Sequence, residues 1–246
     1  MVLGFILNGV FIMKKNIILL SLLFCSSLLG KISYRSGLEL SDVWGKKVIL
    51  AWDLNEVIFN VDYSVLMKHP VMAIKMGKLN KKKKELKKQG LDEGYVFEAT
   101  IRRCKPKKVM KYIHFMAKLM TPNYDVVRLM HEVKAHGHTH AILSNMGETI
   151  WANLCPKHSE VNNLFTGHNC VAHKRSNGRW YHKPDADYYQ LFVNLNKRND
   201  DTLIVFIEDD KYGCHIPAAL QNGIDVAIKF TNDRQLELDL AVLGLI

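Results

Sequence analysis

The chain has 246 residues, 48% of them hydrophobic, so it can bury a substantial core and is neither disordered nor collagen-like. Its formal charge of +10 would favour nucleic-acid binding if it were spread over the whole chain. Fifteen Lys and Arg against four Asp and Glu lie between residues 63 and 111, and the rest of the chain is close to neutral. The basicity therefore belongs to one segment.

Residues 1–30 have the pattern of a targeting segment. A lysine pair follows Met13, then comes an apolar stretch, and small residues lie between Ser26 and Gly30, which is the layout of a secretory signal. We predict that Met13 is the real start. The protein is then exported, to the periplasm or outside the cell, or stays anchored to a membrane through this segment alone. A cytoplasmic location is the less favoured alternative.

Four cysteines follow this segment: Cys104, Cys155, Cys170 and Cys214. Their even number permits pairing in an oxidising compartment, but no C-x-x-C spacing occurs. Free thiols in a core and disulfides both stay open, so cysteine usage does not decide the compartment.

Residues 47–59 contain the first chemical signal. Residues 48–52 are apolar and lead directly into Asp53, which is typical of a strand buried on both faces. Open α/β sheets bind ligands at the carboxyl ends of their strands, where Asp53 would lie. On local grounds alone, a turn or helix-cap role for Asp53 is the alternative.

Residues 63–121 predict a small basic helical cap. Apolar residues recur there at helical intervals, with Gly90 and Gly94 interrupting the pattern. The lysines, densest at residues 81–88, form either a solvated helix face or an electrostatic funnel for an anionic substrate or surface. Few aromatic residues lie among them, so a nucleic-acid partner is not expected.

The remaining chain returns to α/β alternation. The predicted elements are a helix at residues 124–135 ended by Gly137, a strand at 141–143, a hairpin turn at 176–178, a helix after 183–185, and strands at 202–207 and 226–228. The strand ends carry Asp53, then Ser144 with Asn145, then an acidic cluster at residues 208–210. A lysine, Lys183, precedes the second of these helices.

Four ordered motifs resemble the haloacid dehalogenase (HAD) superfamily of hydrolases over about residues 46–230. The motifs are an apolar strand ending Asp53-Leu54-Asn55, the strand ending Ser144-Asn145, Lys183-Pro184-Asp185, and Glu208-Asp209-Asp210-Lys211-Tyr212-Gly213, which is similar to E-D-S-x-x-G. The resemblance implies a Rossmann-like three-layer α/β/α core with a parallel sheet and a small helical cap inserted after the first strand. Residues 46–62 and 122–246 would form the core, and residues 63–121 the cap.

The resemblance also implies a magnesium-dependent phosphohydrolase or phosphotransferase acting on a small phosphorylated or other anionic molecule. Asp53 would be the nucleophile that forms an aspartyl phosphate. Ser144, Asn145 and Lys183 would hold the phosphate group, with Lys183 also screening Asp53 from neighbouring acids. The implied Mg²⁺ ligands are Asp53, the main-chain carbonyl of Asn55, and Asp209, with Glu208 or Asp210 close by.

Asn55 departs from the family pattern. Phosphatases of this family carry a second Asp there as acid/base, and an amide cannot transfer a proton at ordinary pH. Loss of general acid/base catalysis costs roughly 10² to 10⁴ in rate. A catalytically impaired binding protein on the same fold, or a non-phosphatase activity such as dehalogenation, are therefore the alternatives.

Histidines offer a competing transition-metal site. They occur in two groups, His131, His136, His138 and His140, then His158, His168, His173 and His182. His136, His138 and His140 alternate through a turn with no Cys or carboxylate at ligand spacing, so a polar helix end and loop are the favoured interpretation.

Overall fold

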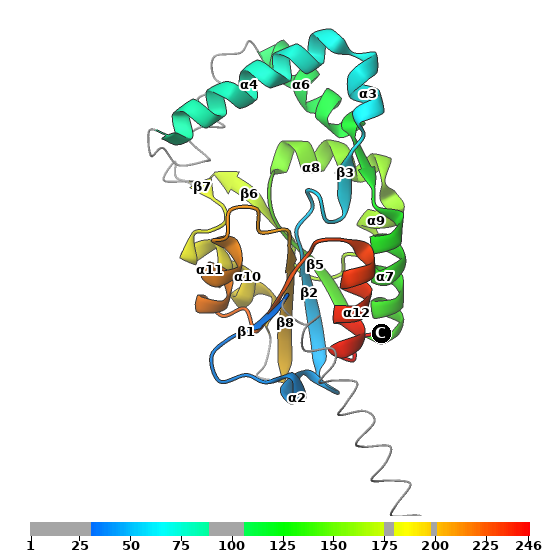
Figure 1. Cartoon of the computed structure of the whole chain (residues 1–246), viewed down its shortest axis with the longest axis vertical. Coiled ribbons are helices and arrows are strands. Elements are labelled where there is room, and N and C mark those ends of the chain that lie inside the picture. The colour runs from blue at the N-terminus through cyan, green and yellow to red at the C-terminus, as the bar shows by residue number, and fades with distance from the viewer. Residues whose placement is uncertain (1–30, 89–105, 175–179, 198–200) are drawn as a thin grey trace, which may run out of the picture.

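The computed structural model describes residues 31–88, 106–174, 180–197 and 201–246 (Figure 1). The predicted targeting segment, the turn at residues 176–178, and Cys104 all lie outside the described residues. The three described cysteines, Cys155, Cys170 and Cys214, are free thiols. No helix in the described part of the chain is long and apolar enough to cross a membrane.

A seven-stranded sheet of order β1-β9-β8-β2-β5-β6-β7 forms the centre of the described structure. Its strands are β1 (Ile32–Tyr34), β2 (Lys47–Trp52), β5 (Thr139–Gly147), β6 (Cys170–Lys174), β7 (Trp180–Tyr181), β8 (Thr202–Glu208) and β9 (Val226–Lys229). The five strands from β9 to β6 are parallel, and the two edge strands β1 and β7 are antiparallel to their neighbours.

The two central strands follow directly from their apolar sequences. Every residue of β8 is buried, and so is every residue of β2 after Lys47. Runs of this kind need cover on both faces of the sheet, which a parallel sheet receives from its crossover helices. β2 and β8 are in register from Lys47 opposite Thr202 to Trp52 opposite Ile207, so both strands end at the same level.

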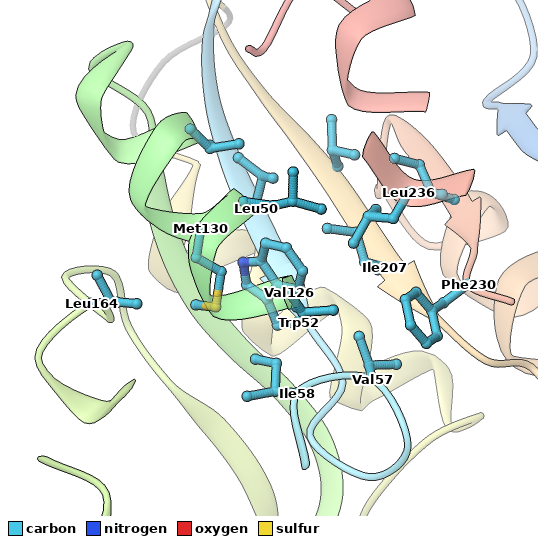
Figure 2. Close-up of a cluster of buried hydrophobic side chains, with 14 of the residues drawn as sticks. Leu50, Trp52, Val57, Ile58, Val126, Met130, Leu164, Ile207, Phe230 and Leu236 are labelled. Carbon is cyan, nitrogen blue, oxygen red and sulfur yellow. The ribbon is translucent and has the colours of Figure 1, made fainter. Parts of the chain in front are cut away.

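Helices cover both faces of this sheet. On one face, α7 (Tyr124–Ala135) and α12 (Asp233–Val242) pack on the side chains of β2 and β8 that Figure 2 shows, including Leu50, Trp52 and Ile207. On the other face lie α10 (Ala186–Asn196) and α11 (His215–Gln221), which contribute Tyr188, Phe192 and Ile216 to a second cluster. This arrangement confirms the predicted three-layer α/β/α class.

Several predicted boundaries agree with the structure. α7 spans the predicted residues, and Gly137 follows it with φ +87°, a left-handed conformation that ends a helix at little cost only for glycine. The predicted hairpin is present as the antiparallel pair β6 and β7. One detail differs from the prediction, since the edge strand β1 precedes the Asp53 strand, which is therefore the second strand of the described residues.

The predicted helical cap follows the Asp53 strand. After β3 (Phe59–Val61) come α3 (Tyr63–Lys68), α4 (Pro70–Lys88) and α6 (Pro106–Leu119), and β4 (Met120–Pro122) returns antiparallel to β3. We call α3, α4 and α6 the cap helices. α6 packs against α8 (Glu148–Leu154), which leads to a 3₁₀ helix, η1 (Cys155–Lys157), and a short α-helix, α9 (Ser159–Asn162). A short helix, α2 (Leu40–Val43), lies at the opposite end of the molecule from the cap helices (Figure 1).

Candidate active site

Asp53 lies at the carboxyl end of β2, where the chain leaves the sheet. Its backbone N–H donates to the carbonyl oxygen of Ile207 over 3.0 Å, and its side chain is buried. A tight turn follows, closed by the N–H of Phe59 donating to the oxygen of Leu54 over 2.8 Å. Glu56 occupies that turn with φ +61°, a conformation that non-glycine residues adopt rarely. The turn places Asn55 on the surface, where its side chain is exposed.

Ser144 lies on the neighbouring strand β5 and touches Asp53 directly. Its hydroxyl donates to Oδ1 of Asp53 over 2.7 Å, while its oxygen accepts from the N–H of Met146 over 3.2 Å. The Ser144 side chain is fully buried, and the Tyr188 hydroxyl donates to its main-chain oxygen over 2.8 Å. These contacts orient the serine hydroxyl towards the carboxylate.

Lys183 reaches the same carboxylate from the loop before α10. Its Nζ lies 3.0 Å from Oδ1 of Asp53 and also donates to Oε2 of Glu208. Asn145 holds the lysine backbone, since its amide nitrogen donates to the Lys183 oxygen over 2.9 Å and its amide oxygen accepts from the Lys183 N–H over 2.6 Å. The Asn145 side chain thus positions Lys183, and its predicted contact with phosphate stays a prediction.

Glu208 lies at the last position of β8 and is bonded on both of its oxygens. Oε2 accepts from Lys183, and Oε1 lies 3.1 Å from Nδ1 of His215 and 3.3 Å from the N–H of Asp210. Asp210 in turn accepts from the N–H of His215 over 2.9 Å and stabilises the start of α11. Asp210 therefore belongs to the support of the site.

Burial and charge act against each other in this cluster. Burial disfavours the Lys183 ammonium, but the negative charges of Asp53 and Glu208 outweigh it and raise the pKa of Lys183. Burial also opposes the Glu208 carboxylate, yet Lys183 and His215 lower its pKa to about 2. Burial raises the pKa of Asp53, and the lysine offsets only part of that effect. A charged lysine between two acids therefore holds the cluster together.

Three carboxylates of the described residues could hold a cation together. Asp53, Glu208 and Asp209 each offer one oxygen, and the three oxygens lie within 4.8 Å of one another. Burial and the neighbouring Glu208 and Asp53 raise the pKa of Asp209 to about 6, which indicates negative charge that the protein compensates incompletely. Few carboxylates with oxygen ligands match the preference of Mg²⁺, so the donor set fits that ion.

The histidines do not gather into a metal site among the described residues. His140 is fully buried in the core, where its Nδ1 accepts from the Trp52 indole over 2.9 Å and its Nε2 faces the oxygen of Met130 at 2.8 Å. Burial lowers the pKa of His140 to about 4, so this imidazole is neutral. His131 and His136 are exposed, which agrees with the favoured interpretation of a polar helix end.

Two side chains of the site escaped the sequence reasoning. His215 bonds Glu208, and Lys211 bonds Glu56 and lies 3.5 Å from Oδ2 of Asp209. Lys211 belongs to the fourth motif, residues 208–213, so its position next to three acids already indicates an ion pair there. His215 is seven residues beyond Glu208, and only the turn that precedes α11 brings it back.

Most of the predicted site residues are joined to one another, and the side chain of Asn55, whose predicted ligand atom is the main-chain oxygen, is exposed. Asp53, Ser144, Lys183 and Glu208 are joined by direct contacts, and Asp209 lies at the edge of the group. None of these contacts tests the catalytic roles expected of the residues. Those roles stay predictions.

No protein-family model and no curated protein matches the sequence. Solved structures do match the fold. A HAD family hydrolase from Salmonella enterica serovar Typhi is 17% identical with TM-score 0.51, covering 81% of this chain and 72% of its own. A protein assigned as the HAD-hydrolase YfnB of Bacillus subtilis, bound to magnesium, is 13% identical with TM-score 0.54, covering 81% and 99%. A Thermotoga maritima protein assigned as a β-phosphoglucomutase is 14% identical with TM-score 0.50, covering 81% and 97%. These likenesses confirm the predicted HAD-like fold.

Proposed function

We propose that this chain is a magnesium-dependent phosphohydrolase or phosphotransferase that acts on a small phosphorylated molecule through Asp53. The observation that carries the proposal is the contact of one buried carboxylate with both a serine hydroxyl and a lysine ammonium, 2.7 Å and 3.0 Å from its Oδ1. These groups come from three separate segments at the carboxyl end of a parallel sheet, where such sheets bind ligands.

In the proposed reaction, an oxygen of Asp53 attacks phosphorus and the bond from phosphorus to the leaving oxygen breaks. The phosphoryl group is then held as an aspartyl phosphate, which water or a second acceptor removes. Lys183 and the Ser144 hydroxyl already point at the carboxylate. They are therefore suited to stabilise the negative charge on the phosphoryl oxygens as it develops.

Asp53 and Asp209 are the proposed side-chain ligands of Mg²⁺, with the main-chain oxygen of Asn55 as a third ligand. Both oxygens of Glu208 already accept hydrogen bonds. We therefore propose that Glu208 attracts the ion by its charge without binding it directly. When bound, the ion would neutralise charge on the phosphoryl group. YfnB, a protein of similar fold, was found bound to magnesium, which supports the choice of ion.

A second candidate is a protein that keeps the fold and the metal site but turns over slowly or not at all. Asn55 favours it, because its amide cannot protonate a leaving group. Substrates whose leaving groups need no proton would suffer least from this change. A different chemistry on the same fold, such as dehalogenation, is the remaining alternative.

The decisive experiment is hydrolysis of p-nitrophenyl phosphate by the full chain, with Mg²⁺ and with excess EDTA. We expect slow turnover that requires both the ion and Asp53. An inert wild-type protein that still binds Mg²⁺ and inorganic phosphate would instead support the binding protein.

A further inference from the structure

Four large apolar side chains on the first two cap helices are exposed. Tyr63, Met67, Val71 and Ile74 have exposed fractions of 69%, 81%, 63% and 62%. Single exposed apolar residues are ordinary on protein surfaces, but four along one pair of helices are a patch that calls for a partner. We call these four residues the outer ridge.

The outer ridge consists of one exposed pair on each helix. Tyr63 and Met67 are four residues apart on α3, and Val71 and Ile74 are three apart on α4, so each pair lies in one row along its own helix. Other positions of the two helices, such as Leu66 and Met72, are partly buried. The ring of His69, between α3 and α4, meets the ring of Phe115 on α6 edge-on at 5.5 Å. α3 and the residue that joins it to α4 thus contact α6, whereas the ridge side chains are exposed.

Lysines continue the same row. Lys75 and Lys78 follow Val71 and Ile74 by four residues each, and both are exposed, as is Lys81. Residues 63–88 contain nine lysines and a single carboxylate, Glu85. The apolar part of the row is therefore joined to a strongly positive part.

We propose that α3 and α4 dock on the surface of an anionic phospholipid bilayer. The outer ridge would enter the boundary between headgroups and acyl chains, and the lysines of α4 would meet the lipid phosphates. α3 and α4 form the end of the molecule opposite α2, so they can meet a flat surface (Figure 1). This contact is additional to the one predicted for residues 1–30.

The chemistry of the ridge distinguishes a bilayer from a nucleic acid. Both partners attract lysines, but single-stranded nucleic acid also needs aromatic faces for base stacking. Tyr63 offers one such face, but Met67, Val71 and Ile74 have none, and these three side chains lose unfavourable water contact on entering lipid. The ridge thus fits hydrocarbon better than bases.

The test is flotation of the full chain with vesicles of phosphatidylcholine alone or with phosphatidylglycerol added. We expect wild type to bind the anionic vesicles more tightly. The variant Met67→Gln/Ile74→Gln should lower the partition coefficient by about tenfold, and Lys75→Gln/Lys78→Gln/Lys81→Gln by a similar factor. Residues 1–30 are the same in all variants, so differences among them report α3 and α4.

Matched controls carry equal changes elsewhere. Leu195→Gln/Leu238→Gln alters two exposed leucines of α10 and α12, and Lys47→Gln/Lys157→Gln/Lys229→Gln removes three exposed lysines outside the cap helices. Both controls should bind as wild type does. As a local readout, anionic vesicles should slow amide hydrogen exchange at residues 63–74.

Equal binding by the ridge variant and its control, with unchanged exchange at residues 63–74, would overturn the proposal. Single-stranded DNA binding that depends on the three α4 lysines but not on Met67 and Ile74, without vesicle binding, would assign the surface to nucleic acid instead. Unchanged circular dichroism and unfolding midpoints establish that each variant is folded. Hydrolysis of a soluble phosphate ester should be the same in the ridge variant and wild type, whatever the outcome for the proposed function.

Discussion

The charged groups at the strand ends and those on the cap helices are arranged in opposite ways. At the strand ends, Asp53, Lys183 and Glu208 are buried and in direct contact. On α4, exposed lysines such as Lys75 and Lys78 follow one another with one carboxylate among them. Buried charges are stable only with matched partners, whereas exposed like charges are screened by water and salt.

The two arrangements suit two different functions, chemistry at a single atom and attraction of a large anion. A buried, fixed set of charges can stabilise one charge distribution at one atom, which is what chemistry on a phosphoryl group requires. An exposed positive surface acts over a Debye length and suits a large or diffuse anion. Substitutions should therefore have large effects on turnover and stability at the strand ends and small ones on the cap helices.

The largest expected effect follows from Asp53→Asn. Replacing the proposed nucleophile by an amide of the same size should lower p-nitrophenyl phosphate hydrolysis by about 10³-fold or more, because an amide does not form the proposed covalent intermediate. EDTA should suppress the wild-type rate. Persistent activity in purified Asp53→Asn protein would move the chemistry away from the strand ends.

Lys183→Met should destabilise the fold more than any single change on the cap helices. It leaves Asp53 and Glu208 buried without their shared cation, which costs about 3–5 kcal/mol of unfolding free energy. Lys211→Met is the matched control, since that lysine is 52% exposed and its ion pair with Glu56 should contribute less than about 1 kcal/mol. Urea denaturation measures both. Equal losses would contradict the contrast between buried and exposed charges.

Asn55→Asp should restore a proton donor at the edge of the site. We expect hydrolysis of an alkyl phosphate to rise by about 10²-fold, and hydrolysis of p-nitrophenyl phosphate much less, since a good leaving group needs no proton. The comparison of kcat for the two esters is the measurement. The same gain on both esters would show that Asn55 does not replace an acid, and no gain on either would favour the binding protein.

Protonation of His140, a buried residue of the core, should lower the free energy of unfolding in mild acid. Its folded pKa of about 4 lies below the ordinary value of about 6.5, so the unfolded chain takes up the proton first as pH falls. His140 therefore contributes stability that is fully present above about pH 6.5 and is lost as pH falls towards 4, about 2 kcal/mol of it between pH 7 and pH 5.

Urea midpoints of wild type and His140→Gln across this range check the His140 prediction. Glutamine can accept from Trp52 and donate to Met130 without titrating, so the pH dependence of the variant should be shallower. Parallel curves for the two proteins would show that folding does not lower the pKa of His140.

The smallest effect should come from the cap lysines. Reversing Lys75, Lys78 and Lys81 to Glu should change the unfolding free energy by less than about 0.5 kcal/mol, because these side chains are exposed. If the lysines also steer an anionic substrate, kcat/KM falls severalfold at low salt while kcat stays constant. A fall in kcat would indicate that these lysines contact the reacting groups. It would contradict the contrast between the strand ends and the cap helices.

Much of the fold could be predicted because its signals are local. The apolar runs of β2 and β8, the helical period of α7 and the glycine that follows it depend on residues within one element. The same holds for the acids at the strand ends. Parallel strands that end together bring Asp53, Ser144 and Glu208 to one edge of the sheet. Lys183 lies in the loop before α10, and its place beside them is implied by the resemblance to the HAD superfamily.

The sequence by itself thus determined the fold class and most of the residues that meet at the strand ends, but not the edge strand β1 or the contact of His215 with Glu208. Only the tertiary structure decided what each polar side chain does. In the folded chain Asn145 hydrogen-bonds the backbone of Lys183, and His215 bonds Glu208. His140 accepts a hydrogen bond from Trp52 in the core. The partners in the first and third pairs are 38 and 88 residues apart. The physical reason is that apolar periodicity depends only on the residues of one helix or strand. A buried hydrogen bond, in contrast, needs a partner that packing brings from elsewhere in the chain.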